Sequence, residues 1–275
     1  PRHPAHSPAS PARTLGLTER AMPGNIQSIE RAAAILRLLS GRTRHLGVVD
    51  LAGELGLPKG TVHGLLRTLQ SVGFVEQDED SGKYKLGAAL LHMGSSYLDG
   101  NELRARALNW SDSLATRTRE AVRIGTLHEE QVLVVHHVFR PDDTFQTLDV
   151  GTLLPAHATA LGKVLLAHHP YVASALAAAG LEAYTEATIT DSERLERELS
   201  RVWAQGWATG IGELVPGQGS YAAPIVDRRG MTVGAMGIFG PPERLLAARQ
   251  PRGDLLGYVR EAARAVSREL GAIPW

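Results

Sequence analysis

The stretch that decides the fold is LPKGTVHGLLRTLQSVG, which runs from Leu57 to Gly73. Residues 59–71 have the periodicity of one α-helix, because apolar residues recur at intervals of three and four positions. The apolar side consists of Val62, Leu65, Leu66, Leu69 and Val72. The opposite side consists of Gly60, His63, Gly64, Arg67 and Ser71, flanked by Thr61 and Thr68. We expect Gly73 to end the helix, since glycine readily takes the left-handed conformation found after helix ends.

The two glycines on the polar side indicate what that side does. Each glycine inside a helix costs about 1 kcal/mol relative to alanine, and a solvated face would gain nothing in return. A helix face that lies against DNA benefits from glycine, because the absence of a side chain lets the helix approach the DNA closely. Hydrogen-bond donors to phosphates and base edges would come from Lys59, Thr61, His63 and Arg67. The alternative is a small helical bundle whose exposed face happens to be rich in glycine.

Two further helices are expected before this stretch. Residues 25–39 form one, with Asn25 or Ser28 as its N-cap and with an apolar face of Ile29, Ala32, Ala33, Leu36 and Leu39. Val48–Leu55 forms the other, and a tight Gly56-Leu57-Pro58 turn joins it to the decisive helix. Two short helices joined by such a turn are typical of a helix-turn-helix.

A β-hairpin is expected directly after the third helix. Residues 74–77 and 83–86 have strand patterns, and Asp78–Gly82 is a turn between them. A hairpin in this position is a wing, so Lys83, Tyr84 and Lys85 could reach a neighbouring phosphate or the minor groove. Alternatively, Tyr84 packs on the hairpin.

The composition is that of an ordinary folded protein. The chain has 275 residues, of which 43% are hydrophobic and 21% charged, and its formal net charge is zero. It has no cysteine, which excludes disulfides and thiolate zinc sites and fits a reducing cytoplasm. No apolar run reaches the length of a membrane span, and no membrane contact is expected. Residues 1–23, rich in Pro, Ala and Ser, are expected to be a disordered leader.

The rest of the chain predicts an α+β domain. Helices are expected at 87–98 and 102–119, separated by the polar break Asp99-Gly100-Asn101, and helices in such a connecting position often carry dimer contacts. Strand patterns follow at 122–127, 132–138, 220–226 and 232–239, with helical patterns at 159–168, 171–179, 192–205 and 254–270. Strands flanked by segregated helices favour a central, largely antiparallel sheet. The expected organisation is a leader (1–23), a winged helix-turn-helix domain (24–87), a linker helix (88–100) and a second domain (101–275).

Several motifs together resemble the IclR family of bacterial transcription regulators. They are Ser28–Ala32, Leu57–Thr61, Leu154–Lys163, Ala222–Ile225 and Gly237–Pro241. The resemblance implies a GAF-like effector domain that binds a small metabolite, a dimer or a dimer of dimers, double-stranded operator DNA as the partner, and control of a catabolic operon. It implies no cofactor.

The resemblance also implies an effector pocket. Its residues would be His157, Thr159, Ala160, Leu161, Gly162, Glu213, Ser220, Gly237 and Phe239. The start of the helix at 159 would offer free N–H groups and a partial positive charge to an anion. Glu213 could instead hold a turn, Ser220 could be a plain strand residue, and Lys163 is expected to point to solvent. The sequence departs from the family pattern in having Gly210 and Gly212 where acids are common, and Gly237 and Phe239 where small polar residues are common. These departures disfavour small keto acids as effectors.

Two segments narrow the resemblance. Residues 135–143 and 265–271 are similar to members that control glycerol catabolic operons. This similarity implies a repressor that is released from DNA by glycerol or glycerol 3-phosphate.

Two other classes of protein are alternatives to a ligand-responsive regulator. An enzyme is disfavoured because Gly217–Ser220 lacks the order of a serine elbow, and because the G-x-G-x-x-A pattern of Gly217–Ala222 leads into a strand instead of a helix. No catalytic residue and no metal site are predicted, since His136 and His137 are adjacent on a strand and face opposite sides. The remaining alternative is a ligand-insensitive DNA-binding protein with a purely structural second half.

Overall fold

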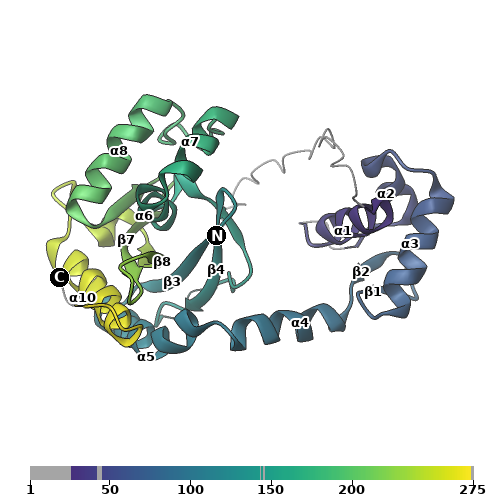
Figure 1. Ribbon diagram of the computed structural model, residues 1–275, viewed down its shortest axis with the longest axis horizontal. Helices are drawn as coiled ribbons and strands as arrows, with labels where there is room; N and C mark the ends of the chain where they lie inside the picture. The colour runs from purple at the N-terminus through teal and green to yellow at the C-terminus, as the bar shows by residue number, and fades with distance from the viewer. Residues whose placement is uncertain (1–25, 42–44, 143, 145, 274–275) are drawn as a thin grey trace, which may run out of the picture. The chain divides into compact units, whose positions relative to one another are not determined.

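The computed structural model describes residues 26–41, 45–142, 144 and 146–273. The leader predicted at residues 1–23 and the possible cap at Asn25 lie outside these residues. The chain divides into two compact units, one up to Gly100 and one from Asn101 onward (Figure 1). Among the described helices, none combines the length and the apolar character that a membrane crossing requires.

The first unit contains three helices, a hairpin and a fourth helix. They are α1 (Gln27–Leu39), α2 (Val48–Leu55), α3 (Lys59–Ser71), β1 (Val75–Gln77), β2 (Tyr84–Leu86) and α4 (Ala88–Asp99). β1 and β2 pair in antiparallel fashion as the predicted wing. The limits of α2 and α3 are those predicted, which confirms the helix-turn-helix.

An apolar core holds these elements together. It includes Ile35 and Leu39 of α1, Leu51 of α2, and Val62, Leu66 and Leu69 of α3. The expected apolar face of α1 was partly wrong, because Ile29 is 63% exposed and Ile35 is buried in its place. Ser28 lies inside α1 instead of capping it, and the N-cap residue is Ile26.

The second unit is built on a six-stranded antiparallel sheet of order β5-β4-β3-β8-β7-β6. The strands are β3 (Ala121–His128), β4 (Gln131–Val138), β5 (Leu153–Pro155), β6 (Ala208–Ile211), β7 (Gly219–Val226) and β8 (Thr232–Gly240). The α+β class with a central antiparallel sheet is therefore confirmed. The edge strands β5 and β6 were not predicted; they have only three and four residues.

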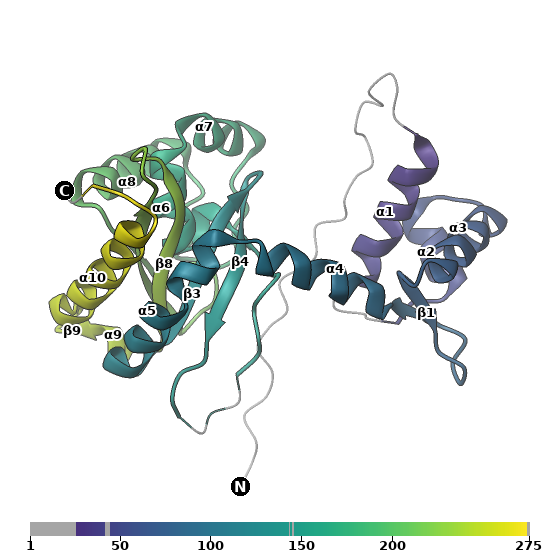
Figure 2. The same cartoon turned by 60° about the horizontal axis from the view of Figure 1, so that its bottom comes forward.

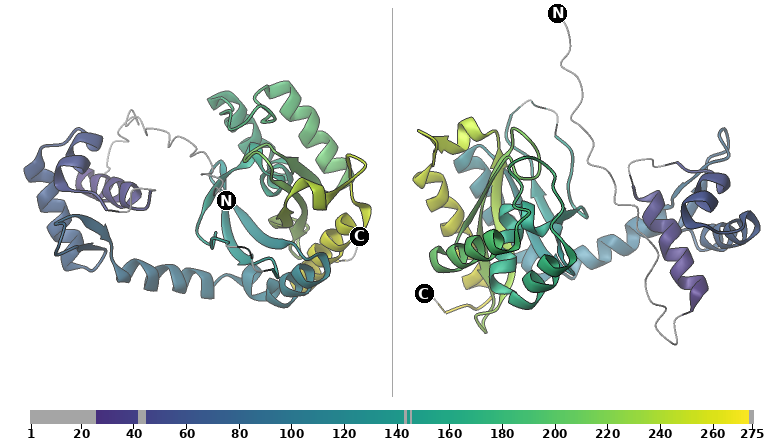
Figure 3. Two further views of the ribbon diagram at one scale, coloured as in Figure 1. Left: turned by 180° about the vertical axis from the view of Figure 1, so that it is seen from behind. Right: turned by 90° about the horizontal axis from the view of Figure 1, so that it is seen from above.

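Helices cover both faces of this sheet (Figures 2 and 3). α5 (Glu102–Thr118) and α10 (Gly253–Glu269) pack together on one face, and α6 (Ala160–His168), α7 (Pro170–Ala179) and α8 (Ser192–Gln205) lie on the other. Three short elements, α9 (Pro242–Leu245), β9 (Leu246–Ala247) and β10 (Gln250–Pro251), connect β8 to α10. The start of α6 thus lies over the half of the sheet formed by β6, β7 and β8.

Candidate functional site

The outer side of α3 carries the predicted DNA-contacting residues. Lys59, Gly60, His63 and Arg67 are exposed, and Thr61 is half-buried. A methyl group added at Gly60 or at Gly64 would meet no atom within 4 Å. The fold of the chain therefore does not require glycine at either position.

The wing offers fewer contacts than its sequence indicated. Lys83 is exposed, but Lys85 forms an ion pair with Glu76 at 3.4 Å. Tyr84 is only 3% exposed and belongs to the apolar core, and its backbone N–H and C=O both pair with Leu46. The assignment of Tyr84 to DNA contact is corrected accordingly, because a ring buried in the core cannot reach a phosphate.

A small pocket opens at the start of α6, between that helix and strands β6 to β8. Its volume is about 40 Å³. Seven of the nine predicted effector residues line it, namely Thr159, Ala160, Leu161, Glu213, Ser220, Gly237 and Phe239. The structure therefore brings together residues that are up to 80 positions apart in sequence (159 to 239).

The other two predicted residues, His157 and Gly162, do not line the pocket. The His157 Nε2 atom lies 2.9 Å from the carbonyl oxygen of Glu182, so the ring is held away from the pocket. Gly162 packs so closely on Ala156 that an added methyl group would lie 2.1 Å from its carbonyl oxygen. Neither residue is part of the pocket lining, so their assignment as effector contacts rests on the family resemblance alone.

Glycines also let the walls of the pocket approach one another. A methyl group on Gly210 would lie 3.1 Å from Ser220 Oγ and 3.2 Å from the Ala160 nitrogen, and one on Gly237 would lie 2.2 Å from the Tyr221 carbonyl oxygen. Thr159 caps α6, since its hydroxyl accepts a hydrogen bond from the Gly162 N–H at 3.1 Å. The pocket is thus formed by closely approaching backbone.

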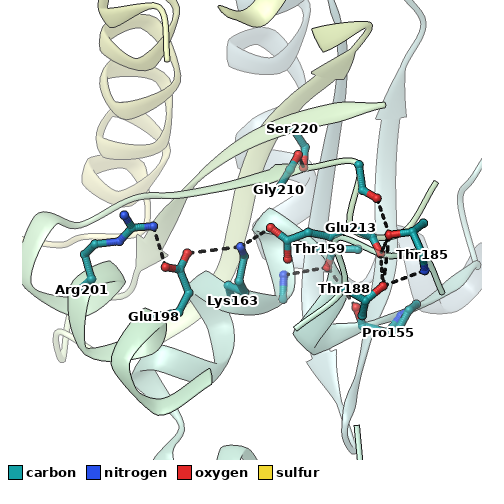
Figure 4. A network of polar contacts seen from close by, with 12 residues as sticks. Pro155, Thr159, Lys163, Thr185, Thr188, Glu198, Arg201, Gly210, Glu213 and Ser220 are labelled. Carbon is teal, nitrogen blue, oxygen red and sulfur yellow. Dashed lines mark hydrogen bonds and ion pairs between the residues drawn. The ribbon is translucent and has the colours of Figure 1, made fainter. Parts of the chain in front are cut away.

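Beside the pocket, Lys163 is buried, which contradicts the expectation that it points to solvent. The residue is 1% exposed. Its ammonium lies 2.7 Å from Glu213 Oε1 and 3.2 Å from Glu198 Oε1, and Arg201 pairs with the other oxygen of Glu198 (Figure 4). A charge buried to this degree needs partners, and these two carboxylates supply them.

Glu213 is held in place at both its side chain and its backbone. The hydroxyl of Thr185 donates to the Gly212 carbonyl oxygen at 2.6 Å, and that of Thr188 donates to the Glu213 carbonyl oxygen, also at 2.6 Å (Figure 4). Burial raises the pKa of the Glu213 carboxyl, and the nearby Lys163 ammonium opposes that rise. Glu213 lines the pocket and is also tied to the surrounding turn, so its position agrees with both roles that the sequence left open.

Arg123 also lines the pocket, although it was not predicted as a site residue. Its Nε donates to Asp149 at 2.8 Å, and its guanidinium lies 3.4 Å from the centroid of the Phe239 ring. Burial lowers the pKa of Arg123, while Asp149 opposes the shift. The alternating pattern of a strand does not reveal that one of its polar residues, Arg123, pairs with Asp149, which is 26 positions away in sequence.

The neighbouring histidines of β4 face opposite sides. His136 Nε2 lies 3.0 Å from the Ser111 hydroxyl of α5, whereas the His137 ring lies 5.4 Å from that of Phe239. Within the described part of the chain, no three His, Cys, Asp or Glu residues are grouped so that they could hold a metal ion.

A helix-turn-helix with an exposed basic face, followed by an α+β unit with a small pocket, defines a DNA-binding transcription regulator with a ligand-binding domain. Comparison with known families agrees. Residues 28–79 match the IclR helix-turn-helix domain, and residues 95–268 match the C-terminal domain of bacterial IclR transcriptional regulators. The chain therefore belongs to the IclR family, which consists of transcription regulators and not of enzymes.

Relatives over nearly the whole chain support this assignment. The glycerol operon regulatory protein of Streptomyces coelicolor is 54% identical over 251 residues, which is 91% of this chain and 99% of that protein. The glycerol operon regulatory protein of Streptomyces griseus is 52% identical over the same shares. The crystal structure of an IclR transcriptional regulator from Alicyclobacillus acidocaldarius is similar with a TM-score of 0.75 at 28% identity, over 90% of this chain and 100% of that chain. The protein is thus a ligand-responsive regulator of the IclR type.

Proposed function

We propose that this protein represses a catabolic operon, in the cytoplasm, and leaves its operator when glycerol or glycerol 3-phosphate occupies the pocket at the start of α6. The observation that carries the proposal is the identity of more than half of the aligned residues with two glycerol operon regulatory proteins. The pocket supports it, since seven of the residues predicted to contact the effector line it.

In this proposal α3 reads the operator. Lys59, Thr61, His63 and Arg67 donate to phosphates or base edges, Gly60 allows the helix to approach, and Lys83 of the wing contacts a neighbouring phosphate. Arg67 is exposed and forms no ion pair with any described residue, so its guanidinium is available to DNA.

We further propose that the protein binds DNA as a dimer, or as a dimer of dimers, so that two α3 helices meet two half-sites. On α4, Leu91, Met93 and Tyr97 are more than half exposed, at 75%, 56% and 57%. Large apolar side chains at this density on one helix favour contact with a second copy. Effector binding would then act as a population shift between arrangements of the dimer that do and do not fit the operator.

The test is a fluorescence anisotropy titration of the protein's own upstream DNA at fixed salt, with and without each of the two compounds. Binding that either compound releases supports the proposal. Binding that both compounds leave unchanged would contradict glycerol control.

Arg67→Ala tests the DNA-reading face in the same assay. We expect an affinity loss of about tenfold, equivalent to about 1.4 kcal/mol. If Arg67 contacts a phosphate, the variant should also release about one counterion fewer on binding. The slope of the logarithm of the DNA-binding constant against the logarithm of the salt concentration should then be smaller by about one. Arg197→Ala, which removes an exposed arginine from α8, is the matched control and should bind as the wild type does. Unchanged affinity of Arg67→Ala would remove Arg67 from the DNA interface.

A further inference from the structure

Three arginines form a row along the outer side of α10. This arginine row consists of Arg260, Arg264 and Arg268. Because the residues follow one another at intervals of four positions, they lie on one side of the helix, about 6 Å apart along its axis. The opposite side of α10 is buried and includes Leu255 and Val259. Arg264 and Arg268 are exposed, and Arg260 is half-buried.

The row keeps its positive charge. In the described part of the chain, its three side chains form no hydrogen bond and no ion pair. The open hollow that they line on α10 is completed by Gly257 and Glu261. Glu261 is already paired, since its Oε2 atom lies 3.0 Å from Nη2 of Arg117. The acid beside the row therefore does not neutralise it.

The helix itself gains little from this arrangement. Like charges four residues apart on a helix repel each other, and the row contains two such pairs, 260/264 and 264/268. The helix dipole favours a cation in the last turn, which accounts for Arg268 and not for the other two. In α5, by contrast, Arg106 stands four residues after Glu102 and pairs with it. An unpaired row of cations is complementary to a polyanion.

The chemistry of this surface favours duplex DNA over an acidic protein. Interfaces between proteins have an apolar core, whereas interfaces with DNA are more polar and much more positively charged. All of α10 is described, and it exposes no large hydrophobic side chain. One DNA strand presents a phosphate about every 3.4 Å along the duplex axis, so a row that is about 12 Å long spans about three phosphates.

Two occupants from the chain itself are disfavoured by charge. A second copy that docked through the same surface would place two arginine rows against each other. Residues 1–25 contain three arginines and one acidic residue, Glu19, so this segment is basic as well. Duplex DNA, in contrast, is a polyanion that the helix-turn-helix of this family already brings to the protein.

We propose that the arginine row of α10 binds the phosphate backbone of duplex DNA, as a contact separate from that of α3 and without reading bases. Guanidinium groups suit this task because they stay charged and present paired donors to phosphate oxygens. Such contacts add affinity that does not depend on base sequence. The inference rests on DNA binding by the family and not on the identity of the effector.

The experiment measures binding of the full chain to a non-operator duplex by fluorescence anisotropy at a series of salt concentrations. Each lost phosphate contact lowers the slope of the logarithm of the binding constant against the logarithm of the salt concentration by about 0.9. For each chain on the DNA, we expect the slope to fall by about one in Arg264→Gln and by about three in Arg260→Gln/Arg264→Gln/Arg268→Gln. At low salt the triple variant should bind about tenfold more weakly or worse. Glutamine forms helices nearly as well as arginine, so both variants should keep α10.

The matched control, Arg194→Gln/Arg197→Gln/Arg249→Gln, removes the same charge from three other exposed positions of the second unit. We expect it to keep the wild-type slope. A row variant with the same slope as this control would overturn the inference. So would a row variant that binds DNA as the control does but no longer binds poly-L-glutamate, because the row would then serve an acidic protein. If the triple variant does not fold, the exposed single variant Arg264→Gln decides the question.

The failure of this inference and that of glycerol control are distinguishable. Operator release by glycerol or glycerol 3-phosphate is measured on the wild-type protein, whereas the arginine row is tested without either compound. An unchanged salt dependence in the row variants, together with release of the operator, would overturn the row alone. A reduced salt dependence without release would keep the row and contradict glycerol control.

Discussion

The two units of the chain bury different kinds of side chain. In the described part of the first unit, the buried side chains are apolar or, at Tyr84, aromatic. The second unit buries Glu120, His137, His157 and Lys163. None of these four residues lines the pocket, so the difference concerns how the interior of the second unit is built and not its ligand contacts. Each of the four has a polar partner inside that unit, as buried polar groups require.

The largest test of this comparison is the Lys163→Met substitution. It leaves Glu198 and Glu213 without their shared cation, and breaking a buried ion pair in this way costs about 3–5 kcal/mol. All four tryptophans of the chain, Trp110, Trp203, Trp207 and Trp275, lie after residue 100, so intrinsic fluorescence during urea unfolding reports on the second unit.

Arg201→Ala is the matched control, because it removes the exposed end of the same network. The Arg201 side chain is 62% exposed, so we expect a loss of no more than about 1 kcal/mol. A loss for Lys163→Met as small as that of the control would show that the buried ammonium is not needed to hold the two acids.

The next test makes one substitution in a helix of each unit. Gly162→Ala in α6 places a methyl group 2.1 Å from the Ala156 carbonyl oxygen, and such overpacking costs about 1–3 kcal/mol. Gly64→Ala in α3 enters open space, so we expect it to stabilise the first unit by up to about 1 kcal/mol. Far-UV circular dichroism during urea unfolding measures both changes.

The DNA affinity of the Gly64→Ala protein then tests whether close approach to DNA is the reason for a glycine at this position. If α3 lies close against DNA, Gly64→Ala should weaken operator binding in the anisotropy assay although it stabilises the fold. A Gly64→Ala protein that is more stable and binds DNA as tightly as the wild type would show that close approach is not the reason.

The contrast between the apolar interior of the first unit and the buried polar residues of the second also explains how much of the structure could be predicted from sequence. The limits of α3 were predicted to the residue, because Val62, Leu66 and Leu69 repeat at helical spacing and their burial completes the core of a small unit. The resemblance to a family located seven of the residues that line the pocket. The pairing of Lys163 was missed because Glu198 and Glu213 are 35 and 50 positions away, and periodicity does not identify partners at such distances. Strand β6 was missed because it has four residues and includes Gly210, a residue type depleted in strands.

The smallest expected effect concerns the buried histidines of the second unit. Burial is the main cause that lowers the pKa values of His136 and His137 below 6.5. The unfolded chain therefore binds more protons than the folded one, so stability is lost as the pH falls through 6.5 toward the lowered values. The raised pKa values of Glu120 and Glu213 act in the opposite direction, because those carboxyls bind protons more readily when folded.

The double variant His136→Gln/His137→Gln isolates the histidine contribution. We expect fluorescence-monitored urea midpoints at pH 7.5 and pH 5.5 to differ less in this variant than in the wild type. An equal difference in both proteins would mean that other groups set the pH dependence of the second unit.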